Sequence, residues 1–287
     1  MALSDLPRRA LTAVIFGAVM LGGMLWSRYS FAALVFIINA GSLYEYLRLI
    51  KKHQQYTPLQ AQTTSRVTLL LGCLFHASVW YALNDAFVGL MAVLIIPFIL
   101  LVFITDLMMN TTRKWKNALL NAGGLVYVSL FLFCFYVLVA PPFYLGAANT
   151  EPWYPRFASI PLGIVLLVWA NDTFAYFAGS LFGKHRIAPE ISPRKSWEGF
   201  AGGLIFAMVT AYVLSGFYFS LNPVQWMVVA SLVVVFGTLG DFFESWLKRQ
   251  AGVKDSGSLM PGHGGFLDRF DALIFCLPFV TLYLMFS

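Results

Sequence analysis

Residues 245–271 place charged and chemically reactive side chains between two strongly apolar segments. Besides five glycines, this stretch holds Lys248, Arg249, Lys254, Asp255, His263, Asp268, Arg269 and Asp271. A membrane-embedded chain seldom carries charge this densely beside hydrocarbon unless it binds a charged ligand. Basic groups pair with phosphate and carboxylates bind hard cations, so the composition favours a nucleotide with a bound metal ion.

Two consecutive predicted helices each present carboxylates near one membrane boundary. The first carries a polar stripe at i, i+3, i+4 and i+7, formed by Asp241, Glu244, Ser245 and Lys248. At the start of the second helix, Asp268 and Asp271 are three residues apart on one face. Mg²⁺ commonly uses one or two carboxylates together with phosphate oxygens and water. The spacing therefore predicts a metal site, and ion pairs with the neighbouring basic residues are the alternative.

The loop between these helices is rich in glycine and ends in Pro261-Gly262-His263-Gly264-Gly265. Glycines let a backbone approach a phosphate closely, and consecutive N–H groups can form an anion-binding nest. His263 could donate to a phosphate or protonate a leaving group. The alternative is a loop histidine with a purely structural role.

Asp172 lies well inside another apolar segment, in the sequence Trp-Ala-Asn-Asp-Thr-Phe-Ala-Tyr. An intramembrane carboxylate is costly unless it is paired, hydrated or bound to a metal, so its presence indicates a functional site. Asn171 and Tyr176 could share its environment, since Tyr176 is one helical turn away. A single structural hydrogen bond is the competing explanation.

Residues 192–199 form a second basic segment, Ser-Pro-Arg-Lys-Ser-Trp-Glu-Gly. Ser192 and Pro193 are expected to start a turn, and residues 196–198 are expected to open a helix. Free N–H groups at a helix start favour anions, and the cations Arg194 and Lys195 beside them would suit phosphate. The simpler interpretation is a basic loop that only obeys membrane charge topology.

Composition identifies a membrane protein made of helices. The chain is 59% hydrophobic and 11% charged, far from the averages of soluble domains. Spanning the hydrocarbon takes roughly 20 apolar residues as helix, and the alternating strands of a membrane barrel are absent. Nine stretches qualify: 10–26, 31–49, 67–83, 86–104, 118–140, 159–182, 198–219, 224–247 and 266–286. The predicted fold class is an all-α polytopic membrane protein with about nine transmembrane helices.

The distribution of the 19 Lys and Arg residues predicts the orientation. With a cytoplasmic N-terminus, 17 of them fall in cytoplasmic segments, and only Arg28 and Arg156 lie on the opposite face. This split follows the positive-inside rule and places the C-terminus outside. Arg8-Arg9 before an apolar run resembles a signal peptide, but no convincing cleavage site follows, so we expect a first span. The net charge of +6 reflects this bias, and no basic stripe indicates nucleic acid.

The two halves differ in polarity. Eight of the 13 acids lie at or after Asp172, so residues 1–140 are interpreted as scaffold and residues 160–287 as the catalytic half of one membrane unit. Cys73, Cys134 and Cys276 occur singly in apolar spans and have neither metal nor disulfide spacing. Hydrolase and redox functions have no support, because Walker A, HExxH, nucleophile-elbow and haem motifs are absent.

The C-terminal 120 residues resemble the phosphatidate cytidylyltransferases, also called CDP-diacylglycerol synthases. That family's signature is Ser, x, aliphatic, Lys-Arg, four residues, Lys-Asp, a small-residue loop, His-Gly-Gly and Asp-Arg-x-Asp. The residues that match it are Ser245, Leu247, Lys248, Arg249, Lys254, Asp255, Gly257, Pro261, His263, Gly264, Gly265, Asp268, Arg269 and Asp271. Two upstream elements of the family are matched by Ser192, Pro193, Arg194, Lys195, Glu198 and Gly199 and by Asn171, Asp172, Ala175 and Tyr176.

The resemblance implies a Mg²⁺-dependent, membrane-embedded homodimer that converts CTP and phosphatidate into CDP-diacylglycerol and pyrophosphate. The metal ligands expected for one or two ions are Asp241, Asp268, Asp172 and Asp271. The expected catalytic residues are Asp241, Asp268, Lys248, Arg249 and His263. The expected substrate-binding residues are Ser192, Lys195, Ser196, Glu198, Lys254, Asp255, Gly264, Gly265 and Arg269. The expected location is a bacterial-type inner membrane, with membrane lipid as a partner and the site facing the cytoplasm.

Two other functions remain open on the sequence alone. CTP-dependent polyprenol or phytol kinases also need a basic, metal-binding cytoplasmic site, but their acceptor is a lipid alcohol. An ion-coupled transporter would also explain carboxylates at Asp172 and Asp241. Transporters of that kind are expected to show inverted repeats and broken helices, and the sequence shows neither.

Overall fold

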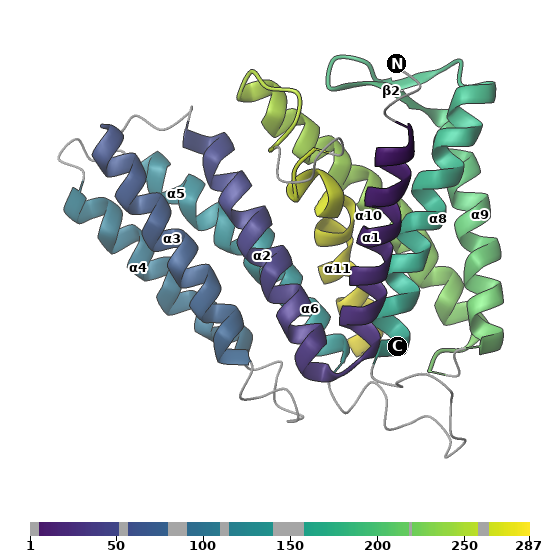
Figure 1. The fold of residues 1–287 in the computed structure, drawn as a ribbon, viewed down its shortest axis with the longest axis horizontal. Coiled ribbons are helices and arrows are strands. Elements are labelled where there is room, and N and C mark those ends of the chain that lie inside the picture. The colour runs from purple at the N-terminus through teal and green to yellow at the C-terminus, as the bar shows by residue number, and fades with distance from the viewer. Residues whose placement is uncertain are drawn as a thin grey trace. The chain divides into compact units, whose positions relative to one another are not determined.

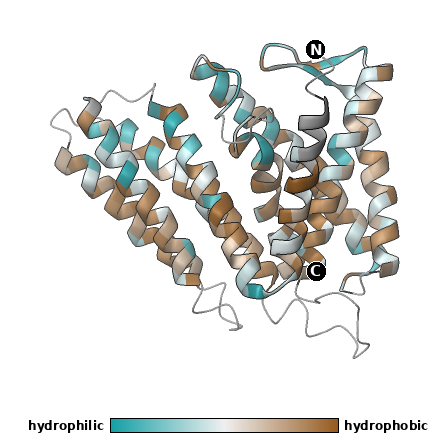
Figure 2. Cartoon of the chain, in the orientation of Figure 1, coloured by the Kyte–Doolittle hydropathy of each residue, from teal (hydrophilic) through white to brown (hydrophobic). Residues whose placement is uncertain are grey.

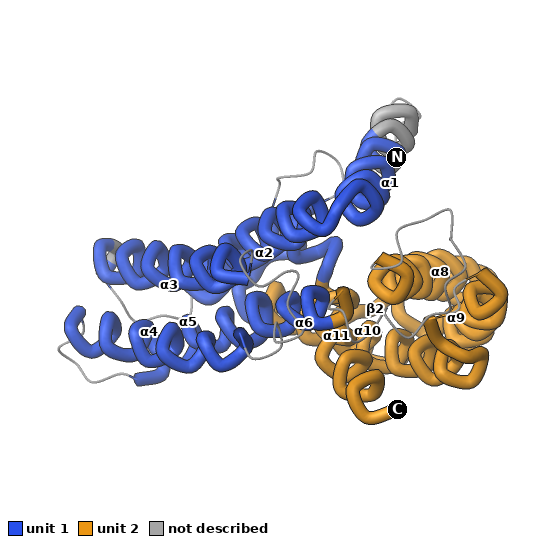
Figure 3. The backbone as a smooth tube through the Cα atoms, turned by 90° about the horizontal axis from the view of Figure 1, so that it is seen from below, with its two compact units in different colours: residues 1–137, 250–270 blue, residues 138–249, 271–287 orange. Residues whose placement is uncertain are grey.

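The computed structural model describes residues 6–51, 57–79, 91–109, 115–139, 158–217, 220–257 and 264–287. The chain forms two compact units (Figure 3). Unit 1 comprises residues 1–137 and 250–270, and unit 2 comprises residues 138–249 and 271–287. The loop of the C-terminal signature belongs to unit 1. The division into a scaffold at residues 1–140 and a catalytic half at residues 160–287 stays a prediction.

Unit 1 is a bundle of helices (Figure 1). Its elements are α1 (Leu6–Leu25), α2 (Arg28–Ile50), α3 (Pro58–Val79), α4 (Ile95–Met109), α5 (Trp115–Gly124), the π-helix η5 (Leu125–Leu130) and α6 (Phe131–Leu138). A capping box starts α2: Ser27 Oγ accepts from the Ser30 N–H at 3.0 Å, and Ser30 Oγ accepts from the Ser27 N–H at 2.9 Å. This reciprocal pair satisfies two of the N–H groups that a helix start leaves open.

A buried polar network crosses unit 1 at η5. In a π-helix the backbone departs from the α-helical hydrogen-bond pattern, and the Ser129 carbonyl lies 3.0 Å from His76 Nε2. Ser129 Oγ donates to Asn39 Oδ1 at 2.8 Å, and Asn39 Nδ2 donates to the Gly72 carbonyl at 3.3 Å. His76 Nδ1 lies 3.1 Å from the Tyr136 hydroxyl. The N-terminal helices are therefore joined by polar contacts as well as by apolar packing.

Unit 2 contains α8 (Ser159–Phe182), β1 (Arg186–Ala188), β2 (Ser192–Ser196), α9 (Trp197–Phe217), α10 (Pro223–Gln250) and most of α11 (Leu267–Phe286). The two strands form an antiparallel hairpin between α8 and α9, with Arg186 opposite Ser196 and Ala188 opposite Ser192. The hairpin is hydrophilic, in contrast to the helices that follow it (Figure 2). The expectation that Ser192 and Pro193 start a turn is wrong. The turn occupies residues 189–191, and Ser192 begins β2.

The all-α membrane fold is confirmed apart from this small hairpin. Each of the nine predicted stretches overlaps a described helix, although the stretches at 67–83, 86–104, 118–140 and 198–219 extend partly outside the described residues. Among the described residues, seven helices are long and apolar enough to cross a membrane: Arg28–Ile50, Met91–Met109, Trp115–Leu138, Ser159–Phe182, Trp197–Phe217, Pro223–Gln250 and Leu267–Phe286. The count of nine crossings and the orientation stay predictions.

Small residues allow α8 and α9 to pack closely. The buried face of α9 repeats every four residues through Gly199, Gly203, Ala207 and Ala211. A Cβ atom at Gly203 would collide with Asn171 Oδ1, and one at Gly199 would lie 2.9 Å from the Ala175 carbonyl. Such stripes let helix backbones approach in a membrane, where hydrophobicity alone does not drive association.

We expect Gly203→Leu to destabilise the protein and Gly216→Leu to leave its stability unchanged. The new side chain at residue 203 would overlap Asn171, whereas a Cβ at Gly216 meets nothing within 4 Å. Overpacking costs about 1–3 kcal/mol, which corresponds to a fall in melting temperature of roughly 2–10 °C. Thermal unfolding in detergent measures the difference. Equal melting temperatures for the two variants would contradict the described packing.

Candidate active site

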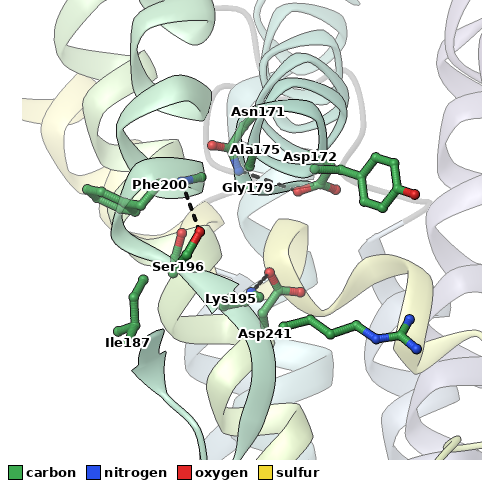
Figure 4. Close-up of a pocket in the computed structure, with 13 residues that line it drawn as sticks. Asn171, Asp172, Ala175, Gly179, Ile187, Lys195, Ser196, Phe200 and Asp241 are labelled. Carbon is green, nitrogen blue, oxygen red and sulfur yellow. Dashed lines mark hydrogen bonds and ion pairs between the residues drawn. The ribbon is translucent and has the colours of Figure 1, made fainter. Parts of the chain in front are cut away.

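A pocket of about 780 Å³, including its open mouth, lies in unit 2 (Figure 4). Helix α8 lines it with Asn171, Asp172, Ala175, Tyr176 and Gly179. The hairpin and the start of α9 contribute Ile187, Arg194, Lys195, Ser196, Gly199 and Phe200, and α10 contributes Thr238 and Asp241. Three segments that are far apart in sequence, and that were each predicted to be functional, thus converge on one cavity.

Lys195 and Asp241 form an ion pair across this pocket. The Lys195 Nζ atom also lies 5.0 Å from the centre of the Phe242 ring, where a cation is attracted to the aromatic face. Both side chains of the pair keep more than a quarter of their surface exposed. The amine is therefore held at the pocket while it remains accessible to an anionic ligand.

A second group of charges lies behind Asp241, between α10 and α11. Asp271 is hydrogen-bonded to Asp241 and lies in the electrostatic field of Glu244. Glu244 is almost completely buried and pairs with Lys248 one turn along α10. Carboxylates this close cannot all be ionised without cations or a proton nearby. Unit 2 thus contains three clustered carboxylates, two of which have a lysine partner.

The pair Asp241 and Asp271 fits a divalent cation by its chemistry. Their oxygens are hard ligands, and Mg²⁺ takes most of its remaining ligands from water and phosphate. In the part of the chain that the structure describes, no three His, Cys, Asp or Glu side chains form a complete metal cage. Two carboxylates fit an ion whose other ligands are phosphate oxygens and water.

Ser196 and Glu198 build the start of α9. Ser196 Oγ accepts from the Gly199 N–H at 3.2 Å and caps the helix, as the predicted helix start required. The Glu198 carboxylate accepts from the backbone N–H groups of Lys184 and His185 at 3.1 and 3.2 Å and lies 2.6 Å from His185 Nδ1. Glu198 therefore anchors the entry of the hairpin. Ser192 lies at the far end of β2 and is not among the residues that line the pocket.

The predicted site residues Lys254, Asp255, Gly264, Gly265, Asp268 and Arg269 all belong to unit 1. Asp268 Oδ2 accepts from the N–H groups of Ser256 and Gly265, each at 2.9 Å, and lies 3.0 Å from Ser256 Oγ. The Gly265 N–H, predicted to help form an anion nest, is thus engaged by Asp268. Gly264 has φ +85°, a conformation that glycine adopts readily.

The structure leaves part of the predicted site untested. His263 lies outside the described residues. Lys248 and Arg249 are in the last turn of α10 in unit 2. The roles proposed for these residues and for the unit 1 loop therefore stay predictions.

Sequence reasoning gave no site role to Thr238 or to Glu45. Thr238 lines the pocket three residues before Asp241, and it extends the polar stripe of α10 by one turn. Glu45 is a fully buried acid within a membrane-length helix. A carboxylate in such a position is itself a signal of function, and this signal could have been found from the sequence.

Comparison with known proteins identifies, over residues 7–287, the family that the C-terminal motifs resemble. The model of the cytidylyltransferase family matches residues 7–287. A phosphatidate cytidylyltransferase of Bacillus subtilis is 31% identical over 281 residues, which cover 96% of each chain. One of Haemophilus influenzae is 40% identical over 169 residues, or 54% of this chain and 57% of that protein. One of Staphylococcus haemolyticus is 49% identical over 121 residues, which cover 42% of this chain and 46% of that protein. The chain belongs to the cytidylyltransferase family.

Proposed function

We propose that this protein is a phosphatidate cytidylyltransferase, which makes CDP-diacylglycerol and pyrophosphate from CTP and phosphatidate in phospholipid synthesis. The observation that carries the proposal is the meeting of Asp172, Lys195 and Asp241 in one pocket. Asp172 and Lys195 come from the two upstream elements of the family, and Asp241 lies four residues before the C-terminal signature. The full-length similarity to the Bacillus subtilis enzyme supports the same activity.

The proposed reaction is an in-line displacement at the α-phosphorus of CTP. A phosphate oxygen of phosphatidate forms a bond to that phosphorus, the bond to the oxygen that bridges the α- and β-phosphates breaks, and pyrophosphate leaves. The attacking phosphomonoester is already mostly ionised near neutral pH, because its second pKa is about 6. A strong general base is therefore unnecessary, and the site contributes mainly positioning and electrostatic stabilisation.

Lys195 is the residue best placed to stabilise the transferring phosphate. Its amine faces Asp241 at the pocket, and an incoming phosphate oxygen can replace the carboxylate as its partner. The Phe242 ring keeps the amine close while this exchange takes place. Arg194 also lines the pocket and adds positive charge on the same strand. Such fixed cations lower the energy of the charge that develops during phosphoryl transfer.

Mg²⁺ is proposed as the cofactor, with Asp241 and Asp271 as protein ligands in unit 2. Asp172, which lines the same pocket as Asp241, is proposed as a further ligand. Bound there, the ion would neutralise phosphate charge and polarise the α-phosphoryl group. Asp268 stays a predicted ligand from unit 1. A second ion and the homodimer stay predictions as well.

We further propose that the pocket faces the cytoplasm of a bacterial plasma membrane. The helices and the bacterial relatives support an integral membrane protein. Sidedness rests on charge, because the hairpin at the pocket carries Arg186, Arg194 and Lys195 on the face that the positive-inside rule assigns to the cytoplasm. CTP is available on that side.

Product analysis tests the proposed function. Purified protein in mixed micelles is incubated with labelled CTP, Mg²⁺ and either phosphatidate or a lipid alcohol such as a polyprenol. We expect labelled CDP-lipid and pyrophosphate in equal amounts with phosphatidate, and no product with the alcohol. CDP and a phosphorylated alcohol would instead identify a kinase. Solute flux in proteoliposomes without either product would identify a transporter.

A further inference from the structure

Glu45 is a buried carboxylate on α2 in unit 1, and it does not line the pocket of unit 2. Its exposed fraction is 0%. Its Oε2 atom accepts from Ser256 Oγ at 2.7 Å and from the Leu267 N–H at 2.9 Å. These two partners lie on either side of the glycine-rich loop of the family signature. One side chain of α2 thus holds both ends of that loop.

The loop glycines make room for this carboxylate. A Cβ atom at Gly257 would collide with Glu45 Oε1, and one at Gly265 would collide with Glu45 Oε2 and Ser256 Oγ. One turn earlier on α2, Gly41 packs against the Phe266 ring so closely that a Cβ there would overlap it. Gly257 and Gly265 belong to the signature, and their small size is explained by Glu45 without reference to a phosphate.

Glu45 is also linked to Asp268 through one hydroxyl group. Ser256 Oγ lies 2.7 Å from Glu45 Oε2 and 3.0 Å from Asp268 Oδ2. Asp268 in turn accepts from the N–H groups of Ser256 and Gly265. At the start of α11, the Glu45 carboxylate accepts from the Leu267 N–H, where negative charge interacts favourably with the helix dipole.

We infer that Glu45 is a positioning residue, which fixes the two ends of the signature loop and thereby the directions of the Asp268 and Arg269 side chains. The inference rests on the proposed function, because it explains how a residue outside the pocket supports the activity. Glu45 acts through Ser256 and the start of α11. A carboxylate at this depth is costly, and its contacts to the loop explain why the chain carries it.

The contact between Glu45 and Gly257 allows a double-mutant test. Glu45→Ala and Gly257→Ala are each expected to lower kcat/KM by roughly 10- to 100-fold, as losses of supporting contacts do. The double variant is expected to be no worse than Glu45→Ala alone, because the carboxylate that the added methyl group would strike is gone. Such non-additivity is the signature of a direct contact. Glu190→Gln, an exposed acid on the hairpin turn, and Gly216→Ala, an open helical glycine, are the matched controls.

Two further variants separate positioning from simple loss of stability. Glu45 Oε1 has no hydrogen-bond partner among the described residues, so Glu45→Gln can keep both loop contacts through its single oxygen. We expect it to lose less than about 5-fold in kcat/KM. Ser256→Ala removes the hydroxyl between Glu45 and Asp268, and we expect it to lower kcat by about 10-fold at an unchanged melting temperature.

The measured losses of the variants decide whether Glu45 is a positioning residue. Losses that multiply in the double variant, or near-normal turnover in Glu45→Ala, overturn the inference. If Glu45→Ala does not fold, the other three variants decide. The inference is then overturned if Ser256→Ala keeps the wild-type kcat and if Glu45→Gln loses as much kcat/KM as Gly257→Ala. A wild-type protein that makes no CDP-diacylglycerol refutes the proposed function before any variant is compared. An active wild type with unaffected variants refutes only the role of Glu45.

Discussion

Asp241→Asn is expected to lower kcat for CDP-diacylglycerol synthesis by about 10²–10³-fold while the protein still inserts and folds. Asp241 pairs with Lys195, is hydrogen-bonded to Asp271 and lines the pocket. The amide removes a negative charge that would bind the metal ion and position the lysine. Removing one such preorganised group typically costs this much in turnover. Initial rates at saturating CTP and phosphatidate measure the effect.

Two controls test whether the effect of Asp241→Asn on turnover comes from misfolding and whether it depends on Lys195. Size-exclusion profiles and melting temperatures should match those of wild type, because the asparagine is isosteric. Lys195→Met alone should also slow turnover, and the double variant should lose less than the product of the two single losses, since the side chains form one pair. Wild-type-like turnover in Asp241→Asn would remove this residue from the metal site.

Chelation of divalent cations is expected to abolish activity, and excess Mg²⁺ is expected to restore it fully. The three carboxylates at α10 and α11 have two lysine partners, and phosphates of the substrates add further negative charge. Without a bound cation this concentration of charge opposes nucleotide binding. Activity measured with EDTA, then with rising Mg²⁺, gives the concentration needed for half-maximal rate.

A variant is needed to locate that metal, because CTP itself binds Mg²⁺. Asp271→Asn should raise the Mg²⁺ concentration for half-maximal rate by roughly 10-fold if this carboxylate is a ligand. Glu190→Gln on the hairpin turn serves as the control. Activity that persists in EDTA, or an unchanged Mg²⁺ requirement in Asp271→Asn, would exclude the proposed ligand set.

The sequence predicted those parts of the structure that depend on local patterns. Long apolar runs predicted the helices because only helices satisfy their backbone inside hydrocarbon. Asp172, Lys195 and Asp241 could each be selected because a charged residue at a membrane boundary or within a span needs a partner. All three residues line one pocket, to which three separate segments contribute.

Other features depend on long-range packing and leave a weaker trace in the sequence. Glu45 meets Ser256 and Leu267 more than 200 residues away in the chain. Its loop glycines looked like a phosphate nest because a glycine pattern does not reveal which group fills the space. The β1–β2 hairpin was missed because Ser192 and Pro193 resemble a turn, whereas the turn itself occupies residues 189–191.

The close contact of α8 with α9 has a consequence for how the pocket can change shape. The backbones meet through Gly199 and Gly203, and the rings of Phe174 and Phe206 stack at 3.6 Å. Close-packed surfaces of this kind leave little room for relative movement, so Asp172 on α8 is held against α9. We expect any widening of the pocket to separate Lys195 on β2 from Asp241 on α10 and so to break their ion pair.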